Sequence, residues 1–103
     1  MLGFLKQLFS KPINPQLQTI LAREVTIIDV RTPLEFKAGH VDTAINVPLA
    51  TLDSQIERIK KMRQPIVTCC ASGHRSGIAE GKLTAAGIEA YNGGGWKYVQ
   101  KHL

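Results

Sequence analysis

The chain has 103 residues, 44% apolar and 20% charged, which is enough for one hydrophobic core and too few for two domains. Its net charge of +5 comes from basic residues scattered along the chain, with a modest cluster at Lys60, Lys61 and Arg63. The few aromatic residues do not alternate with basic ones, so the composition argues against a nucleic-acid-binding protein.

Residues 1–13 are predicted to form an N-terminal extension, followed by one domain over residues 14–103. Leu2, Leu5 and Phe9 are spaced as on one side of a short helix. We expect this segment to cover the domain's own core, in preference to attaching to a membrane surface. Polar residues interrupt this apolar run before it reaches signal-peptide length, and the only two cysteines are adjacent and cannot crosslink distant segments. A cytoplasmic location is therefore expected.

Helical and strand-like segments alternate along the rest of the chain. The run at 25–30 is β-branched and apolar almost throughout, which is typical of a parallel strand covered on both faces. In chain order we first expect a helix at 14–22, which is capped by Asn14 and has Pro15 in its first turn. A strand at 25–30, a short helix at 34–37, an extended piece at 44–47 and a surface helix at 51–62 follow. The second half is expected to contain a strand at 65–70, a helix at 76–86, a strand at 88–91, a glycine turn at 93–95 and a terminal helix. The predicted fold class is α/β, with a central, mostly parallel sheet flanked by helices.

The loop after the second buried strand is the candidate site, because ligands bind at the carboxyl ends of strands in such sheets. Backbone N–H groups of this small, flexible loop at a helix start would stabilise a thiolate, so Cys70 is predicted to be a reactive nucleophile. Arg75 is suited to holding an oxyanion, whereas a solvent-facing role is favoured for His74. Cys69 alternates to the other face of the strand and is expected to be inert. The predicted substrate-binding residues are Ala71, Ser72, Gly73, His74 and Arg75.

Other chemistries lack their motifs. Two cysteines and three histidines show no paired metal-ligand spacing, so no metal is expected. There is no phosphate-binding loop with its lysine, and the three glycines at 93–95 are not followed by a dinucleotide-binding pattern. No cofactor is therefore predicted.

Several ordered motifs are similar to those of a known family. They are "IIDVRTPLEFKAGHVDTAINVP" at 27–48, "CASGHRS" at 70–76, and glycines followed by Trp96. On these motifs the chain, over 17–96, resembles the rhodanese-like (sulfurtransferase) domains of the small single-domain kind. The resemblance implies that Cys70 carries sulfur as a persulfide, and that residues 71–75 complete the loop around it.

The resemblance also assigns supporting residues. Asp29 and Arg31 would organise the active-site side of the sheet, with a structural salt bridge at least as well supported as substrate contact. Ser76, at the predicted start of the next helix, is a further supporting residue. Glu35, Gly39 and His40 are expected to determine the fold and to take no part in the chemistry. Cys69 stands where the family more often has an aromatic or aliphatic residue, which raises a second interpretation, that it resolves a modified Cys70.

Only four residues separate Cys70 from Arg75, one fewer than in related phosphatases. The resemblance therefore implies transfer of sulfane sulfur from a small anionic donor such as thiosulfate to cyanide or a thiol, and disfavours a small phosphatase or arsenate reductase. A second hypothesis is a persulfide relay that serves a donor or acceptor protein, with Lys60, Lys61 and Arg63 as its docking surface.

Overall fold

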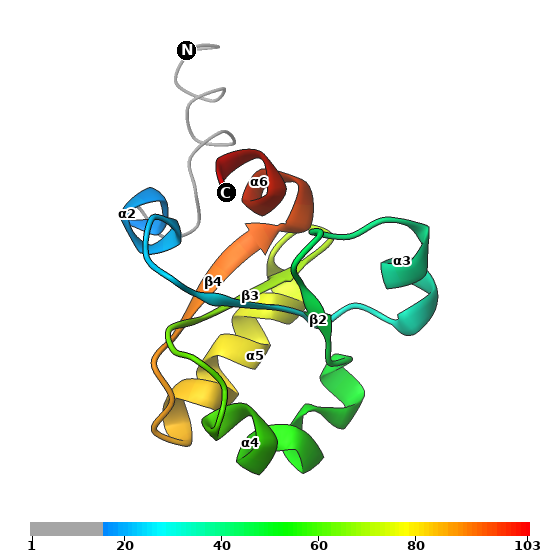
Figure 1. Ribbon diagram of the computed structural model, residues 1–103. Coiled ribbons are helices and arrows are strands. Elements are labelled where there is room, and N and C mark those ends of the chain that lie inside the picture. Colours follow the sequence, from blue (N-terminus) through cyan, green and yellow to red (C-terminus); the bar gives the residue numbers. More distant parts are fainter. Residues whose placement is uncertain (1–15) are drawn as a thin grey trace, which may run out of the picture.

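The protein is described by a computed structural model that places residues 16–103. It contains a four-stranded parallel sheet in the order β2-β1-β3-β4 (Figure 1). The strands are β1 (Thr26–Asp29), β2 (Ile45–Asn46), β3 (Ile66–Cys70) and β4 (Ala90–Gly95). The helices are α2 (Leu17–Leu21), α3 (Pro33–Ala38), the 3-10 helix η1 (Leu49–Thr51), α4 (Leu52–Lys60), α5 (His74–Ala85) and α6 (Trp96–His102). The predicted α/β class with a central parallel sheet is confirmed.

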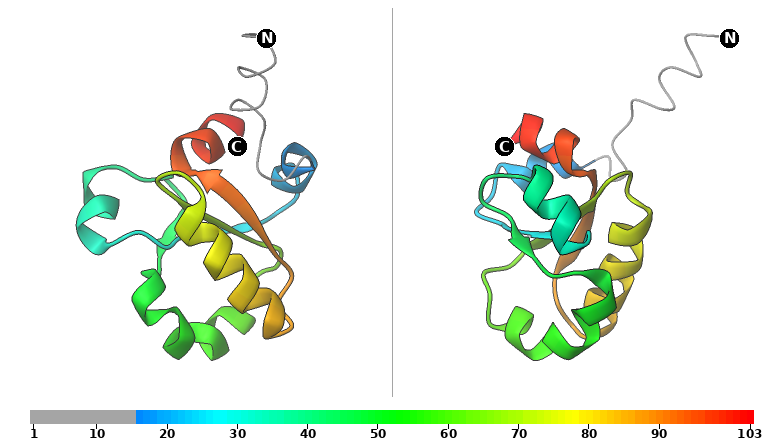
Figure 2. Two further views of the ribbon diagram at one scale, coloured as in Figure 1. Left: turned by 180° about the vertical axis from the view of Figure 1, so that it is seen from behind. Right: turned by 90° about the vertical axis from the view of Figure 1, so that its right-hand side faces the viewer.

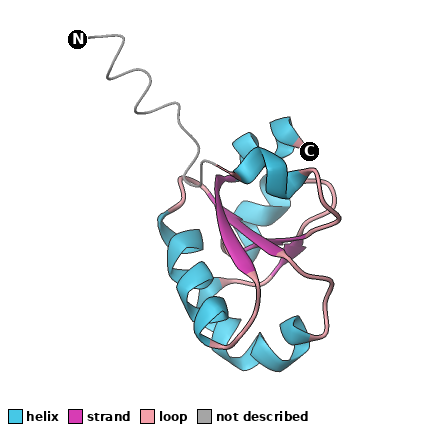
Figure 3. Cartoon of the chain, turned by 90° about the vertical axis from the view of Figure 1, so that its left-hand side faces the viewer, coloured by secondary structure: helices cyan, strands magenta, loops and turns pink. Residues whose placement is uncertain are grey.

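Helices cover both faces of the sheet, α2 and α6 on one side and α4 and α5 on the other (Figures 2 and 3). Neighbouring residues of β3 point to opposite faces, so that Ile66 packs with α4 and α5 while Val67 packs with α2 and α6. The same alternation places Cys69 and Cys70 in different hydrophobic clusters. Side chains of the helices therefore pack on both faces of the sheet within residues 16–103.

The sequence around α3 places this short helix at the carboxyl end of β1. Pro33 occupies its first turn, and the Thr32 side chain accepts a hydrogen bond from the Glu35 backbone while the Glu35 carboxylate accepts one from the Thr32 backbone. This reciprocal capping box needs no buried apolar face, and none of the α3 residues is buried. The capping box also holds the backbone of Glu35, and so the base of its side chain, in a fixed position.

Two predicted boundaries near the candidate loop are wrong. Helix α5 begins at His74 and not at residue 76, because Gly73, with φ of 109°, turns the chain into the helix earlier. Residues 93–95, expected to form a turn, continue β4. A Cβ on Gly93 would lie 2.8 Å from the Thr68 carbonyl oxygen and from the Val99 side chain, so this glycine permits close packing inside the strand.

Helix α2 begins at Leu17 with Gln16 as its N-cap, so the helix start predicted at Asn14 is wrong. The predicted extension at 1–13 lies outside the described residues, as do Asn14 and Pro15. Within residues 16–103, no helix is long and apolar enough to cross a membrane.

Candidate active site

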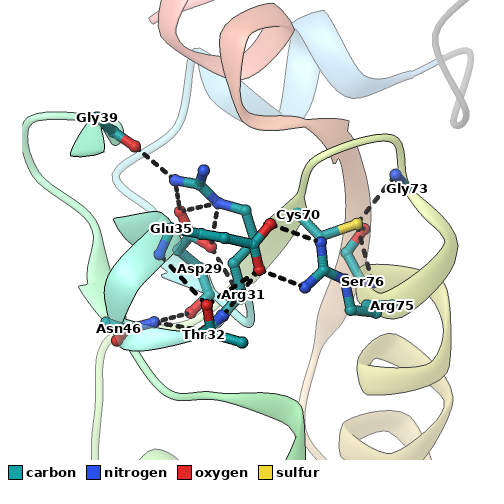
Figure 4. Close-up of polar contacts among 10 residues, drawn as sticks. All are labelled: Asp29, Arg31, Thr32, Glu35, Gly39, Asn46, Cys70, Gly73, Arg75 and Ser76. Carbon is teal, nitrogen blue, oxygen red and sulfur yellow. Dashed lines mark hydrogen bonds and ion pairs between the residues drawn. The ribbon is translucent and has the colours of Figure 1, made fainter. Parts of the chain in front are cut away.

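The candidate site lies where β3 ends and α5 begins, beside the carboxyl ends of β1 and β4 (Figure 4). Cys70 is the last residue of β3 and pairs with Gly95. A Cβ on Gly95 would lie 3.1 Å from the carbonyl oxygen of Ala71, so the end of β4 runs tightly against the loop. The sulfur of Cys70 is thus enclosed by strand, loop and helix, and the residue is 1% exposed.

Three groups of the loop and of α5 point at the Cys70 sulfur. The backbone N–H of Gly73 donates to Sγ at 3.0 Å and that of Ser76 at 3.5 Å, while the Ser76 hydroxyl lies 3.3 Å away. Burial favours the neutral thiol, but hydrogen bonds from the Ser76 side chain and from the backbone N–H groups outweigh it and lower the pKa of Cys70 below its usual range. The environment therefore favours a thiolate, the reactive form of cysteine.

Asn92 of β4 ties these groups together. Its side-chain N–H₂ donates to the Gly73 carbonyl at 3.0 Å. Its side-chain oxygen accepts from the Ser76 hydroxyl at 2.7 Å and from the Gly94 backbone at 2.9 Å. Asn92 is buried and was missed by sequence reasoning. The one signal that could have found it is a polar residue directly before the glycines, where the strand pattern expects an apolar side chain.

Arg75 was predicted to hold an anionic substrate, and in the structure its guanidinium binds a carboxylate of the protein itself. It donates to Glu35 at 2.6 and 3.0 Å, so both carboxylate oxygens are engaged (Figure 4). The hydrogen bond from Arg75 lowers the pKa of Glu35 to about 2. Glu35 was expected to determine the fold only, and that expectation is incomplete because its side chain reaches the candidate site.

Asp29 and Arg31 form a buried ion pair at 2.7 Å, with side chains 0% and 6% exposed. The Arg31 guanidinium also donates to the Gly39 carbonyl at 2.6 Å and lies over the Trp96 ring at 4.9 Å. The Gly39 carbonyl and the Trp96 ring therefore cover the part of the Arg31 guanidinium that Asp29 leaves open. Of the two roles considered for this pair, the geometry supports the structural one, which fixes β1 and the segment after α3 beside the loop.

The other residues of the predicted site differ in their surroundings. Ala71 and Ser72 of the loop are exposed, and so is His74 at the start of α5, which fits the solvent-facing interpretation of His74. Burial raises the pKa of Cys69 to about 12, and its side chain packs on the face of the sheet away from the loop. Among residues 16–103, no group of three or more His, Cys, Asp or Glu side chains could hold a metal ion.

The Rhodanese-like domain model matches residues 14–102. An uncharacterized protein of Bacillus subtilis, YqhL, is 39% identical over 77 residues, which cover 73% of this chain and 60% of YqhL. A rhodanese from E. coli, solved with anions, has a TM-score of 0.65 and 31% identity over 73% of this chain and 91% of that one. The human single-domain sulfurtransferase TSTD1 shares the fold, with a TM-score of 0.66 and 24% identity over 84% and 91%. The chain belongs to the rhodanese-like domain family.

Proposed function

We propose that the protein is a sulfurtransferase that carries sulfane sulfur as a persulfide on Cys70. The observation that supports this most is the set of donors from Gly73 and Ser76 around the Cys70 sulfur. Donors fixed by backbone and by a buried side chain do not have to reorganise when charge on sulfur changes, so they stabilise both a thiolate and a perthiolate. Membership of the family supports sulfur transfer in general.

In the first step, the Cys70 thiolate attacks the outer sulfur of the donor, with thiosulfate as the assay substrate. A sulfur–sulfur bond forms to Cys70, the sulfur–sulfur bond of thiosulfate breaks, and sulfite leaves with the electron pair. Cys70 then carries a perthiolate whose negative charge faces the loop donors. In the second step, cyanide or a thiolate attacks the outer sulfur, which restores the Cys70 thiolate. This double displacement needs no metal and no organic cofactor.

The short loop favours sulfur over phosphate. Four residues between Cys70 and Arg75 provide few N–H groups, and those of Gly73 and Ser76 point at a single sulfur atom. A phosphoryl group would need donors for three oxygens at once. We therefore propose sulfane sulfur as the transferred group, and expect no turnover of aryl phosphate or arsenate under conditions where sulfur transfer proceeds.

The test is thiocyanate formation from thiosulfate and cyanide by the reduced protein. Cys70→Ser should abolish it, while Cys69→Ser should retain it, because the two side chains lie on opposite faces of the sheet. Turnover by Cys70→Ser would overturn the proposal. We also propose that the protein works in a reducing compartment such as the cytoplasm, because the Cys70 thiol must stay reduced to attack a sulfur donor.

A persulfide relay serving a partner protein is the second candidate. It is favoured by the engagement of Arg75 with Glu35, which leaves that guanidinium less available to a small anion. The predicted docking cluster gives weaker support, because Lys60 pairs with Glu57 and Arg63 with Glu24. Sulfur transfer from a protein persulfide to Cys70 without thiosulfate turnover would favour this candidate.

A further inference from the structure

We infer that Glu35 is a specificity-determining residue, which selects against dianionic sulfur donors and in favour of donors with less negative charge. This inference rests on the proposed function and names the substrate class of the same site. The favoured donors are sulfane compounds whose leaving group carries little charge, such as a monoanionic thiosulfonate or the persulfide of a thiol.

The geometry of the Arg75–Glu35 pair carries the inference. The two terminal nitrogens of the guanidinium face the two carboxylate oxygens at 2.6 and 3.0 Å, which is the arrangement a sulfonate group would take. Both side chains keep about a third of their surface exposed, 33% and 36%, so a solute can reach the pair. An anionic donor that approaches Arg75 therefore meets a guanidinium that is already paired with the Glu35 carboxylate.

Glu35 is also held in place from its own side. The backbone N–H and the hydroxyl of Thr32 each lie 3.2 Å from one Glu35 carboxylate oxygen. Turning the carboxylate away from Arg75 would give up charge-assisted hydrogen bonds while the capping box still holds the side chain at the site. A donor cannot simply displace Glu35 into solvent.

The charge balance of the site follows from these contacts. Arg75 and Glu35 cancel each other, as do Arg31 and Asp29. A dianion approaching the Cys70 thiolate thus gains the loop N–H groups but no uncompensated positive side chain among these pairs. Because its pKa is about 2, Glu35 stays ionised at every working pH. Removing its charge should speed the reaction of an anion more than that of a neutral reagent, because only the anion is itself repelled by the carboxylate.

The first test needs no turnover. Alkylation rates of Cys70 are measured with iodoacetate, an anion, and with iodoacetamide, its neutral analogue, in the unmutated protein and in Glu35→Gln. Glutamine keeps the capping acceptor but not the charge. We expect the iodoacetate-to-iodoacetamide rate ratio to rise about threefold to tenfold in Glu35→Gln. An unchanged or lower ratio would overturn the inference. Glu35→Ala, which also lacks the charge, must raise the ratio as well.

Glu89→Gln is the matched control. Glu89 also binds an arginine through both carboxylate oxygens, at 3.0 and 3.4 Å to Arg23, but it lies just before β4, at the end of the sheet away from Cys70. This variant changes the net charge of the protein by the same amount. Its rate ratio should equal that of the unmutated protein. A rise equal to that of Glu35→Gln would assign the effect to overall charge and overturn the inference.

The second test compares sulfur donors. The KM for thiosulfate, a dianion, should fall by about threefold to tenfold in Glu35→Gln, while the KM for benzenethiosulfonate, a monoanion, falls less. Equal changes for both donors would contradict selection by charge. If neither donor is turned over while the alkylation ratio rises as expected, the proposed sulfur transfer fails and the electrostatic role of Glu35 stands.

Discussion

Replacing Ser76 by alanine isolates the one side-chain hydroxyl that contacts the Cys70 sulfur. The Ser76 backbone N–H, 3.5 Å from Sγ, and the Gly73 N–H, at 3.0 Å, both remain in Ser76→Ala. The Asn92 side-chain oxygen also keeps a donor, because the Gly94 N–H still lies 2.9 Å from it. The substitution therefore removes the hydroxyl contact with Sγ together with the hydrogen bond to Asn92, and it leaves no new buried acceptor without a partner.

The expected effect follows from the energy of a hydrogen bond to a charged group, about 1.5–3 kcal/mol. The Ser76 hydroxyl has one hydrogen and lies 2.7 Å from the Asn92 oxygen as well as 3.3 Å from Sγ. We therefore take the lower end, about 1.5 kcal/mol, which corresponds to about tenfold less thiolate at any pH below the pKa. The pKa of Cys70 should rise, because the lost bond stabilised the ionised form.

The assay is the pH dependence of Cys70 alkylation by iodoacetamide. Since only the thiolate reacts, the rate of Ser76→Ala should be about tenfold lower than that of the unmutated protein on the acidic limb and should approach it at high pH. Ser54→Ala is the control, because Ser54 of α4 bonds the Thr51 carbonyl and has no contact with the site. If the alkylation rate of Ser76→Ala reached half its maximum at the same pH as that of the unmutated protein, or at a lower pH, the proposed stabilisation of the thiolate by the Ser76 hydroxyl would be refuted.

Three further predictions concern the surroundings of the site. Cys69→Ala should keep full thiocyanate turnover, because that thiol has a pKa of about 12 on the opposite face, and a loss of turnover would give it a role. Gly93→Ala should lower the free energy of unfolding in urea by about 1–3 kcal/mol or more, because its Cβ would lie 2.8 Å from three atoms. A Cβ on Gly81 of α5 would meet no atom within 4 Å, so Gly81→Ala should raise the free energy of unfolding by about 0.5–1 kcal/mol. Equal changes in Gly93→Ala and Gly81→Ala would contradict the close packing at Gly93. Asp29→Asn, which leaves Arg31 buried without its charged partner, should destabilise the fold by about 3–5 kcal/mol, and an unchanged melting temperature would contradict it.

The central part of the site could be predicted because its signals are local in sequence. The strand ending at Cys70 is apolar except for Thr68, and the loop to Arg75 precedes a segment with helical spacing. Alternation along a strand correctly separated Cys69 from Cys70. These inferences need only the neighbours of each residue, and the parallel sheet then determines at which edge they meet.

The contacts that the sequence did not reveal join distant segments. Glu35 and Arg75 are 40 positions apart, and no local pattern indicates that α3 places its glutamate against the start of α5. Asn92 meets Ser76 across a strand and a helix that are 16 positions apart. Glycines predict a turn when only their backbone freedom is considered, whereas Gly93 is needed because Val99 packs against it.

Sulfur transfer to Cys70 is tested most directly by the intact mass of the reduced protein after incubation with a sulfane donor and removal of excess reagent. Thiosulfate and benzenethiosulfonate are both used, so that a poor fit of one donor is separated from a lack of chemistry. A persulfide on Cys70 predicts a mass gain of one sulfur atom, located at Cys70 by peptide mapping, absent from Cys70→Ser and removed by cyanide with release of thiocyanate. No added sulfur from either donor, or the same gain in Cys70→Ser, would contradict it.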